Sequence, residues 1–358
     1  MRLISTAVCG SVALVLLAGC SGSASGNAST PNSSVPSAAG LLTVYGNTIN
    51  VIPKQYMPAR IKPMRGKRVP AFPMKGIYVS EISSSSLYGF PKNNSTDADP
   101  FCSVPASDVQ GFGVDNSGNI ILPEGTGGVV VWQGPQMCGN SGPPVTITDP
   151  YGTAIDASAI NAETGNIAVA NVKDTGATPG SISICTLASG TCSTNLTNSN
   201  LNLVGGVGMN SAGDCWADGL NTSAVAVLVY FAGCTGAGQL ASGFTNGFYG
   251  GVDIDNGGNL VTTSLFGPGF SLPSTVNVYS GCNPACTLLS STLLNGESIY
   301  GHIGKQNARY VTTNVELSDV EVYTYTKTGL TLYYSFIGGL TCDTSECAAA
   351  AYSPSSKK

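Results

Sequence analysis

Three residues could carry chemistry: Asp253 and Asp255 in GVDIDNGGNLVTT (residues 251–263), and His302, the only histidine in the chain. Two aspartates at alternating positions can bind a cation, and an imidazole can accept a proton near neutral pH. The aspartate segment lacks the third alternating acid and the later glutamate of an EF-hand loop. We therefore expect Asp255 to shape a turn, with calcium binding as the alternative, and we predict no other cofactor.

The position of Asp255 recurs along the chain. Three similar segments, GFGVDNSGNIIL, ASAINAETGNIAVA and GVGMNSAGDCWA, place Asp115, Asn161 and Asn210 there, and the degenerate copy HIGKQNARYVTT places Lys305 there. Asp and Asn cap turns through a side-chain oxygen, and a following glycine adopts positive φ without a steric cost. The recurrence favours a structural role for Asp255, whereas Asp253 is not repeated.

His302 would have to serve any Ser-His-Asp or Cys-His machinery. The sequence contains no G-x-S-x-G, P-loop or H-E-x-x-H motif. We expect His302 to be a hydrogen-bonded structural residue on a strand near the centre of the predicted fold. We assign no catalytic, cofactor-binding or metal residue. Three carboxylates, Glu81, Asp156 and Asp253, remain candidate ligands for a divalent ion.

Two repeating units predict the elements that position these side chains. The turn glycines Gly118, Gly165, Gly213 and Gly258 are 47, 48 and 45 residues apart. Alternating strand-like stretches recur at intervals of 42, 53, 45, 49 and 44 residues: LYGF (87–90), VVVW (129–132), ISIC (182–185), VLVY (227–230), VNVY (276–279) and VEVY (320–323). That spacing allows four short strands per repeat. Six copies predict an all-β fold, a six-bladed β-propeller over residues 76–358.

The two ends of this region suggest how the propeller closes. The first repeat begins at GIYVSE (76–81), which corresponds to a second strand, so its innermost strand is missing. The last apolar stretch, CAAAAYSP (347–354), is a strand without later partners. We predict that this C-terminal strand joins the first blade and leaves no sheet edge open.

The D-x-x-G-N turns and V-x-V-aromatic strands resemble NHL-type repeats and the wider lactonase-like group of six-bladed propellers, over residues 76–358 as architecture. The lactonase-like resemblance implies a divalent metal in the channel, held by acidic and amide side chains from different blades. A metal-dependent hydrolase or lyase is therefore the alternative to a binding module. Glycines on the innermost strands leave few side chains for such a site and indicate close backbone approach: Gly111, Gly113, Gly205, Gly206, Gly208, Gly250 and Gly251.

Twelve cysteines favour disulfides in an exported protein. Cys9 lies in the apolar N-terminal segment, and Cys20 closes it. Of the remaining ten, three pairs are close in sequence: Cys185 with Cys192, Cys282 with Cys286, and Cys342 with Cys347. The partners of four others stay open: Cys102, Cys138, Cys215 and Cys234. Zinc is the alternative, but the sequence has no C-x-x-C.

The first twenty residues have the layout of a secretory signal peptide. Their end, Leu17 to Cys20, resembles the bacterial lipobox, which implies cleavage before Cys20 and acylation of that cysteine. Several acyl chains hold a protein on a membrane durably. Residues 21–40 are rich in Ser, Gly and Pro and predict a flexible tether. Ser21 resembles an outer-membrane sorting signal, for a host with two membranes.

Charge is distributed unevenly. Residues 41–75 contain seven basic side chains and no acidic one, whereas residues 76–358 carry all 20 acids against seven bases. The basic, proline-rich extension is either a strap across the acidic propeller or a contact with anionic lipids or polymers near the anchor. Nucleic acid does not suit an exported protein with an acidic main domain. We predict a monomeric, membrane-anchored lipoprotein of the cell envelope that serves, without catalysis, as a binding or scaffold module for an envelope protein or glycan.

Overall fold

The computed structural model describes residues 76–353, apart from segments 82–85, 92–99, 107–110, 116–117, 125–127, 134–143, 161–164, 175–178, 248–249, 266–272, 299, 305–308, 315–316, 318 and 337–346. The chain divides into two compact units, Met1–Met57 and Pro58–Lys358, and every described residue belongs to the second. The predicted signal peptide with Cys20, the tether and the basic extension lie outside the described residues, as do Cys138 and Cys342. In the described part, no helix has the length and apolar character needed to cross a bilayer.

Antiparallel strands dominate the described residues. Four sheets each contain four strands in chain order. The first is β4 (Gly113–Val114), β5 (Ile120–Glu124), β6 (Gly128–Trp132) and β7 (Val145–Thr148). The second is β8 (Gly152–Ile160), β9 (Asn166–Asp174), β10 (Ser181–Thr186) and β11 (Cys192–Thr197). The third is β12 (Leu203–Met209), β13 (Cys215–Leu220), β14 (Ala226–Phe231) and β15 (Gln239–Leu240), with the short 3-10 helix η3 (Ala232–Cys234). The fourth is β16 (Val252–Ile254), β17 (Leu260–Ser264), β18 (Thr275–Gly281) and β19 (Cys286–Leu293).

The two ends of the described chain meet in a fifth, eight-stranded sheet. Its strands, in spatial order, are β23 (Gly329–Phe336), β22 (Asp319–Thr326), β21 (Arg309–Asn314), β20 (Tyr300–Gly304), β24 (Cys347–Ser353), β1 (Gly76–Glu81), β2 (Ser86–Pro91) and β3 (Cys102–Pro105). Strand β24 pairs antiparallel with β1, from Gly76 opposite Ser353 to Glu81 opposite Cys347. It also pairs parallel with β20 over two residues. The C-terminal strand thus lies beside β1, the position predicted for it.

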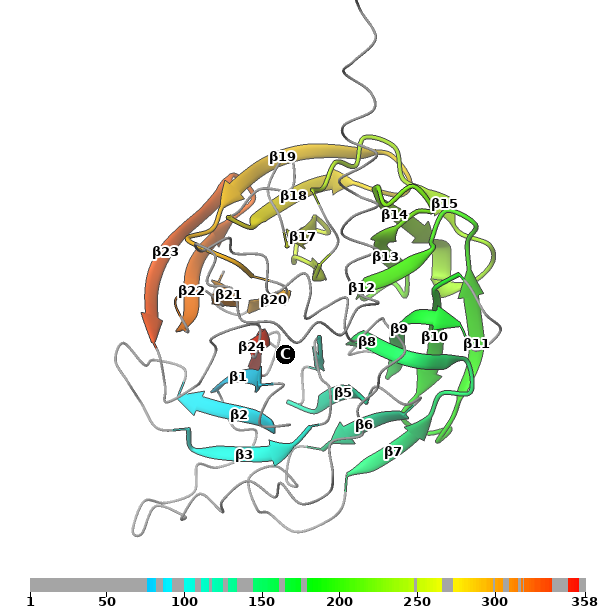
Figure 1. Ribbon diagram of the computed structural model, residues 1–358, viewed down its shortest axis with the longest axis horizontal. Helices are drawn as coiled ribbons and strands as arrows, with labels where there is room; N and C mark the ends of the chain where they lie inside the picture. Colours follow the sequence, from blue (N-terminus) through cyan, green and yellow to red (C-terminus); the bar gives the residue numbers. More distant parts are fainter. Residues whose placement is uncertain are drawn as a thin grey trace, which may run out of the picture. The chain divides into compact units, whose positions relative to one another are not determined.

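Figure 1 shows the sheets arranged around a common centre. Strands β8, β12, β20 and β24 lie nearest that centre, and β3, β7, β11, β15, β19 and β23 lie outermost. Four of the predicted V-x-V-aromatic stretches fall in the third strand, counted outward, of the four-stranded sheets: β6, β10, β14 and β18. The other two fall in β2 and β22, each next to an end strand of the eight-stranded sheet. The sequence repeat therefore marks a strand next to an outermost strand in every sheet.

The hydrophobic core lies between neighbouring sheets. Val276 and Val278 of β18 are buried in one cluster with Ile303, Tyr310 and Tyr323 of the next strand group. Similar clusters fill three other boundaries that the structure describes. Alternate residues of each strand face opposite neighbours, so both faces of a middle strand are buried.

The predicted turn glycines adopt the left-handed backbone conformation. Their φ angles are +80° at Gly118, +71° at Gly165, +92° at Gly213 and +78° at Gly258. Before three of them, the same cap recurs: an Asp or Asn oxygen accepts the amide hydrogen of the residue four positions later, at 2.8 Å for Asp115, Asn210 and Asp255. The prediction of a capped turn at these positions is confirmed.

The innermost strands approach closely through glycine. A Cβ atom on Gly206 of β12 would lie 2.0 Å from the carbonyl oxygen of Gly250, and one on Gly208 would lie 2.8 Å from Val252. A Cβ atom on Gly251 would lie 3.2 Å from the amide nitrogen of Gly301. The predicted close backbone approach is therefore present between these neighbouring strands.

At the outer rim, the hairpin between the third and fourth strands of a sheet contacts the preceding sheet. This contact recurs at four successive boundaries: Thr148 N to Gly190 O at 3.0 Å, Asn198 Nδ2 to Ala237 O at 2.8 Å, Ser242 N to Pro284 O at 3.0 Å, and Leu330 N to Thr292 Oγ1 at 3.1 Å. These bonds join the sheets at the rim, and side-chain packing joins them further in.

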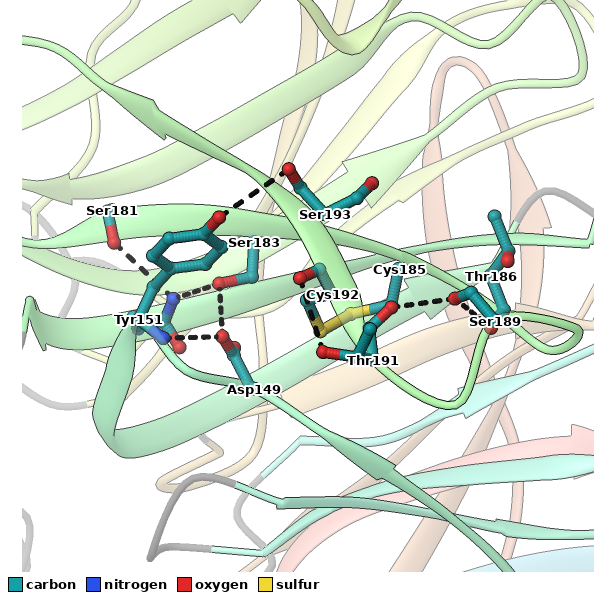
Figure 2. Close-up of a disulfide and its surroundings, with 11 residues drawn as sticks. Asp149, Tyr151, Ser181, Ser183, Cys185, Thr186, Ser189, Thr191, Cys192 and Ser193 are labelled. Atoms are coloured by element: carbon teal, nitrogen blue, oxygen red, sulfur yellow. Dashed lines mark hydrogen bonds between the residues drawn. A yellow bond between two sulfur atoms is a disulfide. The ribbon is translucent and has the colours of Figure 1, made fainter.

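Three of these hairpin regions contain disulfides. Cys185 bonds Cys192 across the β10–β11 hairpin, as shown in Figure 2, and Cys282 bonds Cys286 across the β18–β19 hairpin. Cys215 at the start of β13 bonds Cys234 of η3, a pair that the sequence left open. Cys342, the predicted partner of Cys347, lies outside the described residues, and so does Cys138, whose partner the sequence left open.

Candidate functional site

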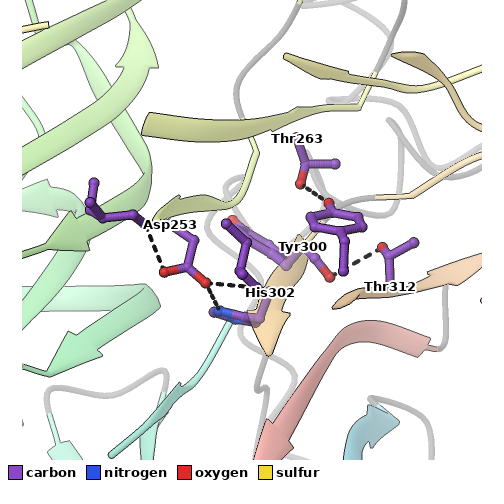
Figure 3. Close-up of polar contacts among 8 residues, drawn as sticks. Asp253, Thr263, Tyr300, His302 and Thr312 are labelled. Carbon is purple, nitrogen blue, oxygen red and sulfur yellow. Dashed lines mark hydrogen bonds and ion pairs between the residues drawn. The ribbon is translucent and has the colours of Figure 1, made fainter. Parts of the chain in front are cut away.

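His302 and Asp253 meet near the centre, as Figure 3 shows. His302 lies on β20 and Asp253 on β16, the innermost strands of neighbouring groups. His302 Nδ1 is 3.6 Å from Asp253 Oδ2, too long for a hydrogen bond in this conformation but close enough for an ion pair when the imidazole is protonated. The side chains keep 19% and 20% of their surface exposed.

Backbone amides fix the carboxylate of Asp253. The amide of Ile254 donates to Oδ1 at 2.7 Å, and the amide of Ile303 donates to Oδ2 at 2.8 Å. The second bond joins β16 to β20, so Asp253 connects two strand groups. Asp253 therefore has a structural role, and its negative charge also faces the imidazole.

The imidazole also has an aromatic neighbour. The Phe112 ring centroid is 5.9 Å from that of His302. His302 Nε2 is buried and has no hydrogen-bond partner among the described residues. The predicted hydrogen bond of the histidine ring is therefore not found in the described part, where one ring nitrogen faces Asp253 at 3.6 Å and the other has no partner.

Tyrosine hydroxyls bond to groups on neighbouring strands beside this pair. The Tyr300 hydroxyl donates to the carbonyl of Gly205 at 2.6 Å, reaching from β20 to β12. The Tyr310 hydroxyl lies 2.6 Å from Thr263 Oγ1. Burial raises the pKa of Tyr310 above its usual range, against the opposing effect of hydrogen bonds from Thr263 and Thr312. Tyr310 is thus a neutral hydrogen-bonding group at neutral pH.

Asp255 belongs to the turn and not to the central pair. Its Oδ1 accepts the amides of Gly257 and Asn259, each at 2.8 Å. Its Oδ2 accepts the Tyr325 hydroxyl at 2.8 Å, which connects the turn to β22. The turn interpretation is confirmed, and the contact with Tyr325 is an addition that no local pattern indicates.

Of the other two carboxylates proposed as channel ligands, the structure describes the side chain of Glu81 only. Glu81 is buried at the end of β1, and the side chain of Asp156 lies outside the described part. Within the described residues, no three His, Cys, Asp or Glu side chains are placed to hold a metal ion.

Sequence reasoning missed a set of polar links between the loops that connect successive sheets and the sheets that these loops enter. At three boundaries, a polar residue in the loop leading to an innermost strand contacts the third strand of the sheet it enters: Asp149 with Ser183 at 2.8 Å, Asn246 with Asn277 at 2.9 Å, and Asn295 with Glu321 at 2.8 Å. Figure 2 shows the first of these links. Their sequence signal is an Asp or Asn a few residues before an innermost strand.

Two buried aspartates, Asp319 and Asp218, have raised pKa values. Burial raises the pKa of Asp319 to about 6, the net result after a hydrogen bond from Ser335 lowers it and the charge of Glu321 raises it. Burial also raises the pKa of Asp218 well above its usual range, against a hydrogen bond from Asn246. Asp319 lies on β22 and Asp218 on β13, so both charges are buried within sheets.

Comparison with known proteins defines the fold and leaves the family open. The chain matches no protein-family model and no curated protein. Its fold is similar to a chain in the crystal structure of a nidogen/laminin complex, at 10% identity and a TM-score of 0.58, covering 79% of this chain and 100% of that one. It is also similar to a protein of unknown function from Bacteroides caccae, at 11% identity and a TM-score of 0.56, covering 78% and 98%.

The strand arrangement and these similarities define the class of protein. The chain is an all-β protein with a β-propeller-like fold and internal disulfides. At these identities the similarity concerns the fold alone.

Proposed function

We propose that six four-strand groups close into a six-bladed β-propeller, in which β24 is the innermost strand of the group formed with β1, β2 and β3. Support comes from the pairing of β24 with β1 in the antiparallel sense and with β20 in the parallel sense. The recurrence of the V-x-V-aromatic stretch in six third strands supports the same number of blades.

The propeller is a non-catalytic binding or scaffold module, exported and anchored to a membrane of the cell envelope through acylated Cys20. The central hydrogen bonds carry this proposal: Asp253 accepts two backbone amides, and the Tyr300 hydroxyl bonds to a backbone carbonyl. Because these groups connect strands, they favour a structural centre. Ligand recognition then belongs to the loops on one face of the ring, where a rigid scaffold commonly presents variable segments.

Binding is tested with purified protein immobilised in a fixed orientation through its C-terminus. Envelope extracts and an array of envelope polysaccharides are passed over it, with the unfolded, reduced protein as the matched control. We expect one envelope protein or one glycan class to be retained by the folded protein only. Retention of nothing from either source would contradict the binding function.

Anchoring is tested by metabolic labelling with an alkyne-bearing fatty acid. We expect the wild-type chain to incorporate label and to partition with the membrane fraction, and we expect the Cys20→Ala variant to lose the label. The Cys9→Ala variant is the matched control and should behave as wild type. Label that persists in Cys20→Ala would contradict the proposed anchor.

The His302–Asp253 pair favours one second candidate, a metal-dependent hydrolase or lyase of the lactonase-like kind. A carboxylate facing Nδ1 leaves Nε2 as the nitrogen that could accept a proton. Metal analysis of the purified protein, together with lactone hydrolysis assays on wild type and His302→Gln, distinguishes the two functions. A stoichiometric divalent ion and hydrolysis that is lost in His302→Gln would replace the binding module with this enzyme.

A further inference from the structure

The outer rim is apolar along one arc. Six exposed large apolar side chains lie on the outermost strands of three consecutive sheets: Leu240 on β15, Leu288, Leu289 and Leu293 on β19, and Leu332 and Tyr333 on β23. The two most exposed are Leu293 at 61% and Tyr333 at 60%. Single exposed leucines are ordinary, but a cluster on adjacent strands indicates a contact surface.

Strands β19 and β23 form the main part of this arc, which we call the apolar rim. They are neighbours along the outer edge in Figure 1, and the amide of Leu330 donates to Thr292 Oγ1 at 3.1 Å between them. The corresponding strand of an earlier group, β11, has the sequence CSTNLT and exposes Ser and Thr instead. The rim is thus apolar on one side of the protein and polar on another.

Basic side chains border the apolar rim. The sequences of β19 and β23, CTLLSSTL and GLTLYYSF, contain no charged residue. The Arg309 guanidinium lies 3.8 Å over the ring of Tyr333 and donates a hydrogen bond to Thr324. Lys327 is exposed in the turn that leads into β23. Leucine and tyrosine flanked by Arg and Lys is the composition that suits the boundary between lipid acyl chains and headgroups.

Bulges argue against a strand as the occupant of this edge. The pairing register shifts between Val278 and Tyr279 opposite β19, and between Val322 and Tyr323 opposite β23, which leaves Leu289 and Tyr333 as the extra residues. A bulge interrupts the regular edge that an added peptide strand requires. The side chains that protrude there are nevertheless apolar. The surface therefore suits a partner that needs no backbone pairing.

We propose that the apolar rim rests on the lipid bilayer to which the chain is anchored. This inference rests on the proposed anchor at Cys20. The propeller then lies edge-on, with Leu293, Leu332 and Tyr333 at the acyl boundary and with Arg309 and Lys327 among the headgroup phosphates. Both faces of the ring stay accessible to the binding partner.

The test uses the full mature protein in vesicles of phosphatidylcholine and phosphatidylglycerol that carry a photoactivatable lipid. After illumination, mass spectrometry maps the cross-linked residues. Val225 at 55% and Leu317 at 57% are internal controls, because they are equally exposed but lie in turns between second and third strands.

We expect cross-links on β19 and β23, and only background labelling on these turns and on β11. The double variant Leu293→Thr, Leu332→Thr should lower the yield at Leu288 and Tyr333 about tenfold, whereas Val225→Thr, Leu317→Thr should leave it unchanged.

Two results would overturn the proposal. One is a yield on β19 and β23 no higher than on the control turns. The other is a dimer in detergent that the Leu293→Thr, Leu332→Thr variant converts to monomer, since a second copy would then cover the rim. If labelling with fatty acid shows that Cys20 is not acylated, the same protein is mixed with the same vesicles. Cross-links on β19 and β23 would then support contact between the apolar rim and lipid, and their absence would reject that contact. Either result is independent of the outcome for the anchor.

Discussion

At the scale of single residues, Asp253 and Asp255 differ although they lie two positions apart. Asp255 accepts two amides of its own turn, whereas Asp253 accepts one local amide and one from β20. The repeat of Asp or Asn in other turns predicts the first role. The second depends on the position of β20, which no local pattern contains.

Replacing Asp255 tests the turn. We expect Asp255→Ala to lower the free energy of unfolding by about 1 to 2 kcal/mol, because the amides of Gly257 and Asn259 and the Tyr325 hydroxyl lose their acceptor. Asp255→Asn should cost less, since Asn210 makes the same cap. Urea unfolding measures both. Equal losses in the two variants would contradict capping as the main role.

The raised pKa of Asp319 predicts that the stability of the protein depends on pH. Its pKa is raised from 3.8 to about 6 in the folded state, so the folded protein binds this proton more tightly than the unfolded chain does. The charged carboxylate therefore destabilises the fold above about pH 6, and the protein regains this stability as the pH falls toward about pH 4. We expect Asp319→Asn to stabilise the protein at neutral pH by on the order of 1 to 2 kcal/mol, allowing for partial solvent access.

Urea unfolding of wild type and Asp319→Asn between about pH 4 and about pH 8 measures this difference. The advantage of the variant should shrink as the pH falls and vanish near the lower limit. A difference that stays constant across the range would show that protonation of Asp319 is not its cause.

At the scale of elements, the third strands and the turns could be predicted because their signals are local. Alternation in VNVY identifies β18, and Gly258 identifies the turn before β17. The pairing of His302 with Asp253 and the bond between Cys215 and Cys234 could not be predicted, because each depends on how segments far apart in the chain are placed. Bulges at Leu289 and Tyr333 were missed for the same reason, since they depend on register.

Inner-strand glycines provide a test at this scale. A Cβ atom on Gly206 would lie 2.0 Å from a backbone oxygen of the neighbouring sheet, whereas one on Gly128 of β6 would have no neighbour within 4 Å. We expect Gly206→Ala to lower the free energy of unfolding by about 2 to 4 kcal/mol, because backbone must move. Gly128→Ala should stay within about 1 kcal/mol of wild type. Thermal and urea unfolding of both variants would show a comparable loss if the close approach did not matter.

At the scale of the whole molecule, β24 holds β1 and β20 together. Removing residues 347–358 deletes β24 and exposes the inner edges of both strands, whereas removing residues 354–358 leaves β24 intact. We expect the longer truncation to lose cooperative unfolding and to aggregate, and the shorter one to resemble wild type.

A point variant tests the same contact if the truncated chain cannot be purified. Ala350 is fully buried in the cluster with Ile77 and Val322, so Ala350→Asp should cost about 3 kcal/mol or more. Wild-type stability in Ala350→Asp would show that β24 contributes little to the fold.

The pairing of β24 with β1 also sets an order in time. The amide of Ala349 donates to the hydroxyl of Ser80, 269 residues earlier in the chain. At usual rates of synthesis, Ser80 leaves the ribosome roughly 15 to 50 seconds before Ala349. Throughout that interval β1 has an open inner edge, which can pair with a wrong strand until β24 covers it.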